Sequence, residues 1–168
     1  MSGTELSLSA LAAIVETVPG VLALKIETSA SAEKISILTD AFGGTVSILS
    51  GNGGIDFYRE LERGASGTMP SATFADHFIQ VWQSYVAGRR DEAREAHQVL
   101  LPFLTLGQRD LDTFLWVEKE ALRRRGVIAN SRLREPSVEP TAALRRELEA
   151  ELDRLGELLP EPTPAEAH

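Results

Sequence analysis

Short apolar runs alternate with helical segments between Leu8 and Ser71, and this alternation limits the folds that the chain can adopt. Apolar runs bounded by Gly, Ser or Pro and separated by helical segments are typical of βα units, whose strands pair in parallel. We therefore expect an α/β fold with a parallel sheet. The expected strands are residues 21–26, 46–50 and 65–69, and the expected helices are residues 9–17, 32–42 and 55–62.

After Ser71 the whole pattern becomes helical. Apolar residues recur at helical spacing, as in the stripe formed by Leu144, Leu148, Leu152 and Leu155. Helices are expected at residues 73–87, 91–101, 108–125 and 141–159. The chain is thus predicted to consist of residues 1–88 with the βα units, a C-terminal helical segment at residues 89–159, and a disordered tail at residues 160–168.

Lys25 is a charged residue inside the first apolar run, Val21–Ile26. Burying an ammonium is costly unless the group is paired or loses its proton, and the neutral amine of a lysine is the form that attacks carbonyl groups. Alternatively, Lys25 lies at an exposed strand end and extends its ammonium to solvent past Glu27, which points to the same side of the strand. The pattern alone leaves both interpretations open.

The two faces of the first strand differ in residue size. Leu22, Leu24 and Ile26 are large and aliphatic, and we expect them to pack on helices, whereas the face with Lys25 lines a narrower interior. This arrangement is typical of a (β/α)8 barrel, which places reactive groups near the carboxyl ends of its strands. Three strands cannot close such a barrel.

Two glycine-rich segments, Ser50–Gly54 and Gly64–Met69, accompany the second and third expected strands. Strand ends are where barrels bind ligands, and glycine lets the backbone approach a small molecule closely. Both segments can equally be simple turns. A phosphate-binding loop of a nucleotide-binding α/β protein is a further alternative for Ser50–Gly54, although neither the dinucleotide fingerprint nor the P-loop pattern is satisfied.

Composition argues against several classes of function. The formal net charge of −8, without a basic patch interleaved with aromatic residues, argues against a nucleic-acid or anionic-membrane surface. The absence of cysteine excludes disulfides and thiolate nucleophiles. His77 and His97 lie on separate expected helices without ligands at metal-binding spacing, so no metal site is expected. No apolar run approaches the roughly 18 residues of a membrane span, and we expect a cytoplasmic protein.

Several short motifs occur in an order that resembles the C-terminal half of the dihydrodipicolinate synthase and N-acetylneuraminate lyase family of class I aldolases. Each motif is weak alone, and their order makes the resemblance specific over residues 2–156. The motifs are Leu24-Lys25, Ser50-Gly51-Asn52, Gly64-Ala65-Ser66-Gly67-Thr68-Met69, Lys119-Glu120-Ala121-Leu122 and Arg134-Glu135-Pro136.

The resemblance implies a partial (β/α)8 barrel, consisting of the last three strands with their helices, followed by a C-terminal helical bundle. It implies that Lys25 forms a Schiff base with pyruvate or a related 2-oxo acid, in a lyase or aldolase that needs no cofactor. By the same resemblance, the backbone of Met69 lies against the bound keto acid and Gly51 lines the pocket.

The family's catalytic tyrosine, its substrate-binding arginine and its threonine pair all fall before the region that this sequence resembles. Ser2-Gly3 is similar to the Thr-Gly that follows the fifth barrel strand, and Asn52 stands where many members have an acidic residue. We therefore expect the chain to be inactive alone and to form a homo-oligomer or to pair with a separately encoded N-terminal half. The alternative is a non-catalytic remnant that acts in oligomerisation or partner binding.

Overall fold

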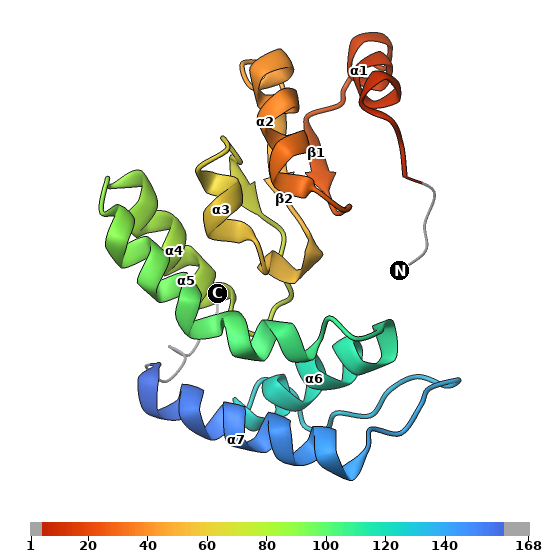
Figure 1. Cartoon of the computed structure of the whole chain (residues 1–168). Helices are drawn as coiled ribbons and strands as arrows, with labels where there is room; N and C mark the ends of the chain where they lie inside the picture. The colour runs from red at the N-terminus through yellow and green to blue at the C-terminus, as the bar shows by residue number, and fades with distance from the viewer. Residues whose placement is uncertain (1–4, 160–168) are drawn as a thin grey trace, which may run out of the picture. The chain divides into compact units, whose positions relative to one another are not determined.

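The computed structural model describes residues 5–159, in which a three-stranded sheet and its helices are followed by further helices. Every strand and helix expected from the sequence is present, with ends shifted by a few residues, so the prediction of an α/β fold is confirmed. The elements shown in Figure 1 are α1 (Leu8–Thr17), β1 (Ala23–Ile26), α2 (Ser31–Phe42), β2 (Ser47–Ser50), the 3-10 turn η1 (Asn52–Gly54), α3 (Phe57–Leu61), β3 (Gly67–Thr68), α4 (Ala75–Val86), α5 (Arg90–Leu106), α6 (Leu111–Arg124) and α7 (Ala142–Leu158).

The three strands form one parallel sheet in the order β1-β2-β3. In its register Lys25 lies beside Leu49, and Ser50 lies beside both Ile26 and Thr68. The strands therefore end together at one edge of the sheet. Parallel strands whose crossovers are helices bring their carboxyl ends, and the loops that follow them, to the same side.

One face of the sheet packs on α2 and α3, which lie beside it in Figure 1. Ile26 and Ile48 point to this face and are 4% and 0% exposed, whereas Lys25 on the opposite face is exposed. The prediction for Leu22 was wrong, because this residue precedes β1 and is 79% exposed. The alternation of a strand does not extend to a residue outside it.

Helix α5 is longer than predicted. We predicted that this helix ends at Leu101, before a proline, which normally disrupts a helix. Instead, α5 continues through Pro102 to Leu106. Phe103 and Leu104, which follow the proline, are buried in this extra turn. Burial of two large apolar side chains, each worth about 1.5–3 kcal/mol, offsets the hydrogen bond that Pro102 cannot donate.

The chain forms two compact units, and each has its own core. The first contains Met1–Ser71 and His77–His97, and the second contains Ala72–Asp76 and Gln98–His168, so the change between them falls within α5. The domain limits at residues 88 and 159 stay predictions, and the expected tail at 160–168 lies outside the described residues, as does Ser2-Gly3. In the second unit the four leucines of the α7 stripe are all buried, as predicted.

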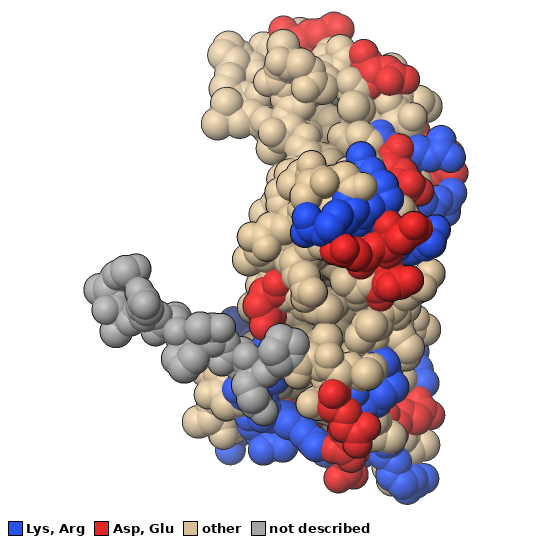
Figure 2. Space-filling model, turned by 90° about the vertical axis from the view of Figure 1, so that its left-hand side faces the viewer, with Lys and Arg blue, Asp and Glu red and all other residues tan. Residues whose placement is uncertain are grey.

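Charged side chains of both signs are interspersed on the face shown in Figure 2. Ion pairs between residues three apart occur at Arg89–Glu92 and, on α6, at Glu120–Arg123. The negative net charge is therefore not gathered into one acidic patch on that face. Within residues 5–159, none of the helices has the length and apolar character needed to cross a bilayer.

Candidate functional site

Lys25 lies near the carboxyl end of β1, on the sheet face opposite the buried Ile26, where Ala23 and Lys25 are both exposed. Its Nζ lies 3.3 Å from Oε2 of Glu27, and the two side chains are 34% and 40% exposed. Both side chains point to the same side because they are two residues apart on an extended segment. The ammonium is thus paired and partly open to solvent.

Glu27 also connects the ends of β1 and β2. Its second carboxylate oxygen, Oε1, accepts a hydrogen bond of 2.9 Å from the backbone N–H of Asn52. Hydrogen bonds to an ionised carboxylate are stronger than those between neutral groups. The carboxylate is therefore held between the ammonium of Lys25 and the backbone of the turn that follows β2.

Gly51 lies directly against this pair. A β-carbon on Gly51 would stand 2.6 Å from the carbonyl oxygen of Ile26, 2.9 Å from Cβ of Glu27 and 3.1 Å from Cε of Lys25. Contacts this short have no room for a side chain. The absence of a side chain at Gly51 is what allows the turn after β2 to pass beside Lys25.

Met69 follows β3 and meets the same edge of the sheet. Its backbone N–H donates a 3.0 Å hydrogen bond to the carbonyl of Ser50, which also accepts a 3.3 Å bond from Oγ1 of Thr68. The Met69 side chain is exposed. The structure thus places Lys25, Gly51 and Met69 at the ends of three neighbouring strands, while the roles assigned to them from the sequence stay predictions.

Glu27 and the Asn52 amide are the components that sequence reasoning missed as parts of a site. The sequence indicates Glu27 only as a neighbour that draws Lys25 toward solvent. The signal in the sequence is that Lys25 and Glu27 are two residues apart on an extended segment, which puts both charges on the same face of the sheet. The contact with Asn52 spans 25 residues and depends on the turn after β2, for which the sequence carries no comparable signal.

A buried carboxyl group lies on the other side of the sheet. Glu60 of α3 is 2% exposed, and burial raises its pKa, an effect that the hydroxyls of Ser31 and Ser50 partly oppose. Because burial disfavours the charged form of a carboxyl group, this part of the first unit's core favours a protonated Glu60. Ser50 is the last residue of β2, at the strand end that carries the site.

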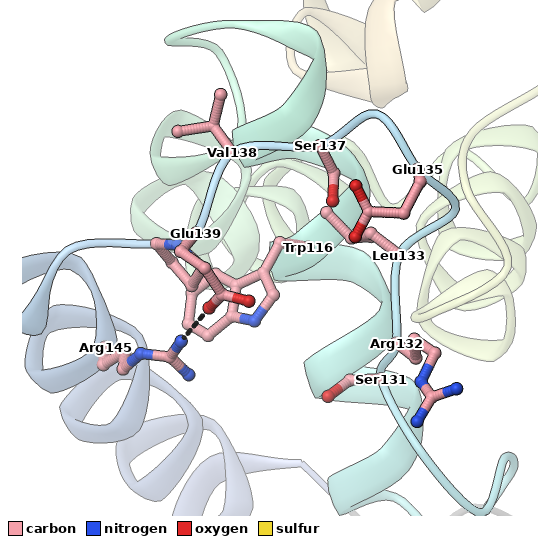
Figure 3. Close-up of a pocket in the computed structure, with 10 residues that line it drawn as sticks. Trp116, Ser131, Arg132, Leu133, Glu135, Ser137, Val138, Glu139 and Arg145 are labelled. Carbon is pink, nitrogen blue, oxygen red and sulfur yellow. Dashed lines mark hydrogen bonds and ion pairs between the residues drawn. The ribbon is translucent and has the colours of Figure 1, made fainter.

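The second unit contains a separate pocket of about 400 Å³, drawn in Figure 3. The guanidinium of Arg145 lies 5.4 Å from the centre of the Trp116 ring and donates a 2.8 Å hydrogen bond to Oε2 of Glu139. The remaining wall is formed by the loop that includes Ser131, Arg132 and Glu135. None of its lining residues belongs to the lysine site. Among residues 5–159, no three His, Asp or Glu side chains are grouped as metal ligands.

The fold is an α/β unit whose parallel strands end together, with a lysine at the carboxyl end of β1 beside a glycine-rich turn. This is the arrangement in which (β/α)8 barrels carry their reactive groups. The chain belongs to the dihydrodipicolinate synthetase family, whose model matches residues 1–155. Both the fold and the family predicted from the sequence are therefore confirmed.

Similar proteins show how much of a full-length family member this chain represents. The chain is 31% identical over 159 residues to L-2-keto-3-deoxyarabonate dehydratase of Azospirillum brasilense, covering 94% of this chain and 51% of that protein. It superimposes on dihydrodipicolinate synthase of Rhodopseudomonas palustris with a TM-score of 0.81 and 32% identity, over 89% of this chain and 51% of that one. For 4-hydroxy-tetrahydrodipicolinate synthase of Methylacidiphilum fumariolicum SolV the TM-score is 0.78 and the identity 26%, over 90% and 49%. The chain thus spans about half the length of these relatives.

Proposed function

We propose that this chain supplies the Schiff-base lysine of a lyase that acts on a 2-oxo acid. Glu27 takes a proton from the Lys25 ammonium, and the resulting amine adds to the keto carbon. The proton held by Glu27 and a second proton from the nitrogen go to the carbonyl oxygen, which leaves as water. The protonated imine that remains withdraws electrons from the adjacent carbon. The observation that carries this proposal is the Lys25–Glu27–Asn52 arrangement, in which a carboxylate fixed by a backbone amide lies 3.3 Å from the ammonium.

Within this class, elimination of water is the reaction that we favour. The A. brasilense relative is a dehydratase, and Glu27 has the position and chemistry of a proton-transfer group beside the imine. Removal of a proton from the carbon next to the imine forms an enamine. The enamine then expels a hydroxyl group from the following carbon as water once that hydroxyl has been protonated, and the imine is restored for hydrolysis. Glu27 accepts the first proton and returns it to the leaving hydroxyl.

The two other predicted residues would shape the space around the keto acid. Gly51 leaves room beside Lys25, because its backbone already lies within contact distance of that side chain. Met69 is placed by its hydrogen bond to Ser50 at the end of β2. We propose that the backbones of Gly51 and Met69 line the substrate, with no cofactor or metal involved.

We further propose that the open face of the sheet is covered by a polypeptide that carries the first five barrel strands. In the described part of the chain, β1 and β3 each pair on one side only, and unpaired strand edges readily accept another strand. We propose that this polypeptide, joined to this chain or encoded separately, carries the catalytic tyrosine, the arginine and the threonine pair that the family resemblance implies. Homo-oligomerisation and a cytoplasmic location stay predictions.

The decisive experiment is reductive trapping. The chain is incubated with pyruvate and borohydride, alone and with the N-terminal half of the A. brasilense relative, and analysed by intact mass and peptide mapping. We expect an adduct on Lys25 that is absent from Lys25→Ala and Lys25→Arg, because arginine keeps the charge without a nucleophilic amine. Lys34→Ala, which removes a lysine that pairs with Glu5, should retain the adduct. Failure to trap any adduct with the N-terminal half present would favour the non-catalytic alternative.

A further inference from the structure

The turn after β2 has a backbone conformation that needs external support. Asn52, Gly53 and Gly54 follow one another with φ angles of 51°, 66° and 80°, all in the left-handed region. A left-handed conformation costs energy for a residue with a side chain, and such backbone persists where the surrounding structure fixes it. Backbone hydrogen bonds within the turn run from the N–H of Gly54 to the carbonyl of Gly51, at 2.8 Å, and from the N–H of Ile55 to the carbonyl of Asn52, at 3.4 Å.

His97 of α5 holds the far end of this turn. Its Nε2 lies 2.9 Å from the carbonyl oxygen of Gly54, and since a carbonyl only accepts, Nε2 carries the hydrogen. The ring is 4% exposed, and burial lowers the pKa of His97. Burial disfavours the charged imidazolium, and the neutral ring can make this hydrogen bond with its hydrogen on Nε2.

Two phenylalanines fix the His97 ring and the turn together. The rings of Phe57 and Phe78 each have their centres 6.4 Å from that of His97. A β-carbon on Gly54 would lie 2.6 Å from the ring of Phe78. The Gly54 carbonyl therefore has a defined position, set by a hydrogen bond on one side and by close packing on the other.

We propose that His97 is a positioning residue for the Lys25 site. It fixes the Gly54 carbonyl, the left-handed turn transmits this position to the Asn52 amide, and that amide holds the Glu27 carboxylate beside Lys25. The link to catalysis rests on the proposed function, whereas the link from His97 to Asn52 is a property of the fold. Small displacements of a supporting group can lower a rate by up to about 100-fold when they disturb the reacting geometry.

His77 provides a matched control in the same compact unit. It is 7% exposed, and its Nε2 lies 2.7 Å from the carbonyl of Ala96, within α5 rather than within the turn. His77→Leu and His97→Leu both remove a buried imidazole and leave a carbonyl without that donor. Of the two, only His97→Leu removes a hydrogen bond to the turn after β2. His97→Gln retains an N–H donor near the same position.

The experiment combines amide hydrogen exchange of Asn52, measured by NMR, with the rate of pyruvate trapping on Lys25 in the chain supplied with the N-terminal half. We expect His97→Leu to accelerate Asn52 exchange and to slow trapping about tenfold. His97→Gln should restore most of both, and His77→Leu should change neither beyond its general effect on stability.

The two measurements, Asn52 amide exchange and pyruvate trapping, distinguish a failure of this proposal from a failure of the proposed function. If trapping is absent in every variant, including the unsubstituted chain, the proposed function fails while Asn52 exchange still decides the role of His97. If His97→Leu and His77→Leu give the same exchange at Asn52, or if His97→Gln restores neither exchange nor trapping, His97 is a core residue without a positioning role.

Discussion

Replacing Gly51 by alanine tests whether the close approach of the turn to Lys25 is as tight as the structure shows. The φ angle of Gly51 is −118°, outside the left-handed region, so an alanine there meets no left-handed penalty. What it meets is the backbone of β1. The new β-carbon would lie 2.6 Å from the Ile26 carbonyl oxygen, whereas ordinary contacts begin at 3.4 Å.

The overlap of about 0.8 Å with a backbone atom that is fixed in a strand cannot be relieved by a side-chain rotation. Inserting a methyl group into a well-packed region typically costs about 1–3 kcal/mol. For a urea m-value of about 2 kcal/mol/M, this corresponds to a denaturation midpoint lowered by about 0.5–1.5 M. The same displacement moves Cε of Lys25, so pyruvate trapping should slow as well.

The assay is urea unfolding of Gly51→Ala beside Gly44→Ala. A β-carbon added at Gly44 would meet no atom within 4 Å, and the φ angle there is not left-handed. The alanine variant at Gly44 should therefore be neutral or slightly stabilised by the stiffer unfolded chain. Equal midpoints for the two variants, within about 0.3 M, would mean that the turn moves freely away from β1. The contact with Lys25 would then not be built into the fold.

Two further predictions concern the cores of the two units. Because the pKa of Glu60 is raised, the folded state binds the Glu60 proton more tightly than the unfolded chain does. The stability that this protonated group contributes is lost as the pH rises from the ordinary glutamate pKa of 4.5 through the raised pKa of the folded state. Glu60→Gln should therefore raise the urea midpoint at pH 7.5 and lose that gain near pH 4, and an equal gain at both pH values would contradict the assignment. Leu148 is 1% exposed, and Leu148→Ala should lower the free energy of unfolding by about 2–5 kcal/mol because it leaves a cavity. The control Leu158→Ala, at an exposed position of the same helix, should lower it by less than about 0.5 kcal/mol. Similar losses for the two variants in calorimetry would show that the buried leucine stripe does not stabilise α7.

The positions of strands and helices could be predicted because their signals are local. Alternation on β1 and the leucine stripe on α7 follow from which residues are apolar and how far apart they stand. The end of α5 could not be predicted in this way. Its proline gives a strong local signal to stop, and burial of Phe103, which depends on the folded core, overrides it.

The candidate site could be predicted in part for the same reason. Lys25 is conspicuous in its strand, and Gly51 directly follows another. The contacts that organise them join distant segments: 25 residues separate Glu27 from Asn52, and 43 separate Gly54 from His97. Neither contact leaves a periodic or spacing pattern, since each depends on the register of the sheet and on the left-handed turn.

The three left-handed residues after β2 also restrict how the sequence around the proposed site could change. At Asn52 and Gly53 nearly every substitution carries a backbone penalty, with Gly, Asn and Asp as the tolerated types. Gly54 is restricted further, because any β-carbon there would lie 2.6 Å from the ring of Phe78. A saturation library over these positions should therefore return few folded variants. Variation would have to occur at neighbouring positions without a left-handed backbone, such as Met69, whose side chain is exposed. The sequence of the turn is therefore constrained by its backbone, and the residues beside it are freer to change.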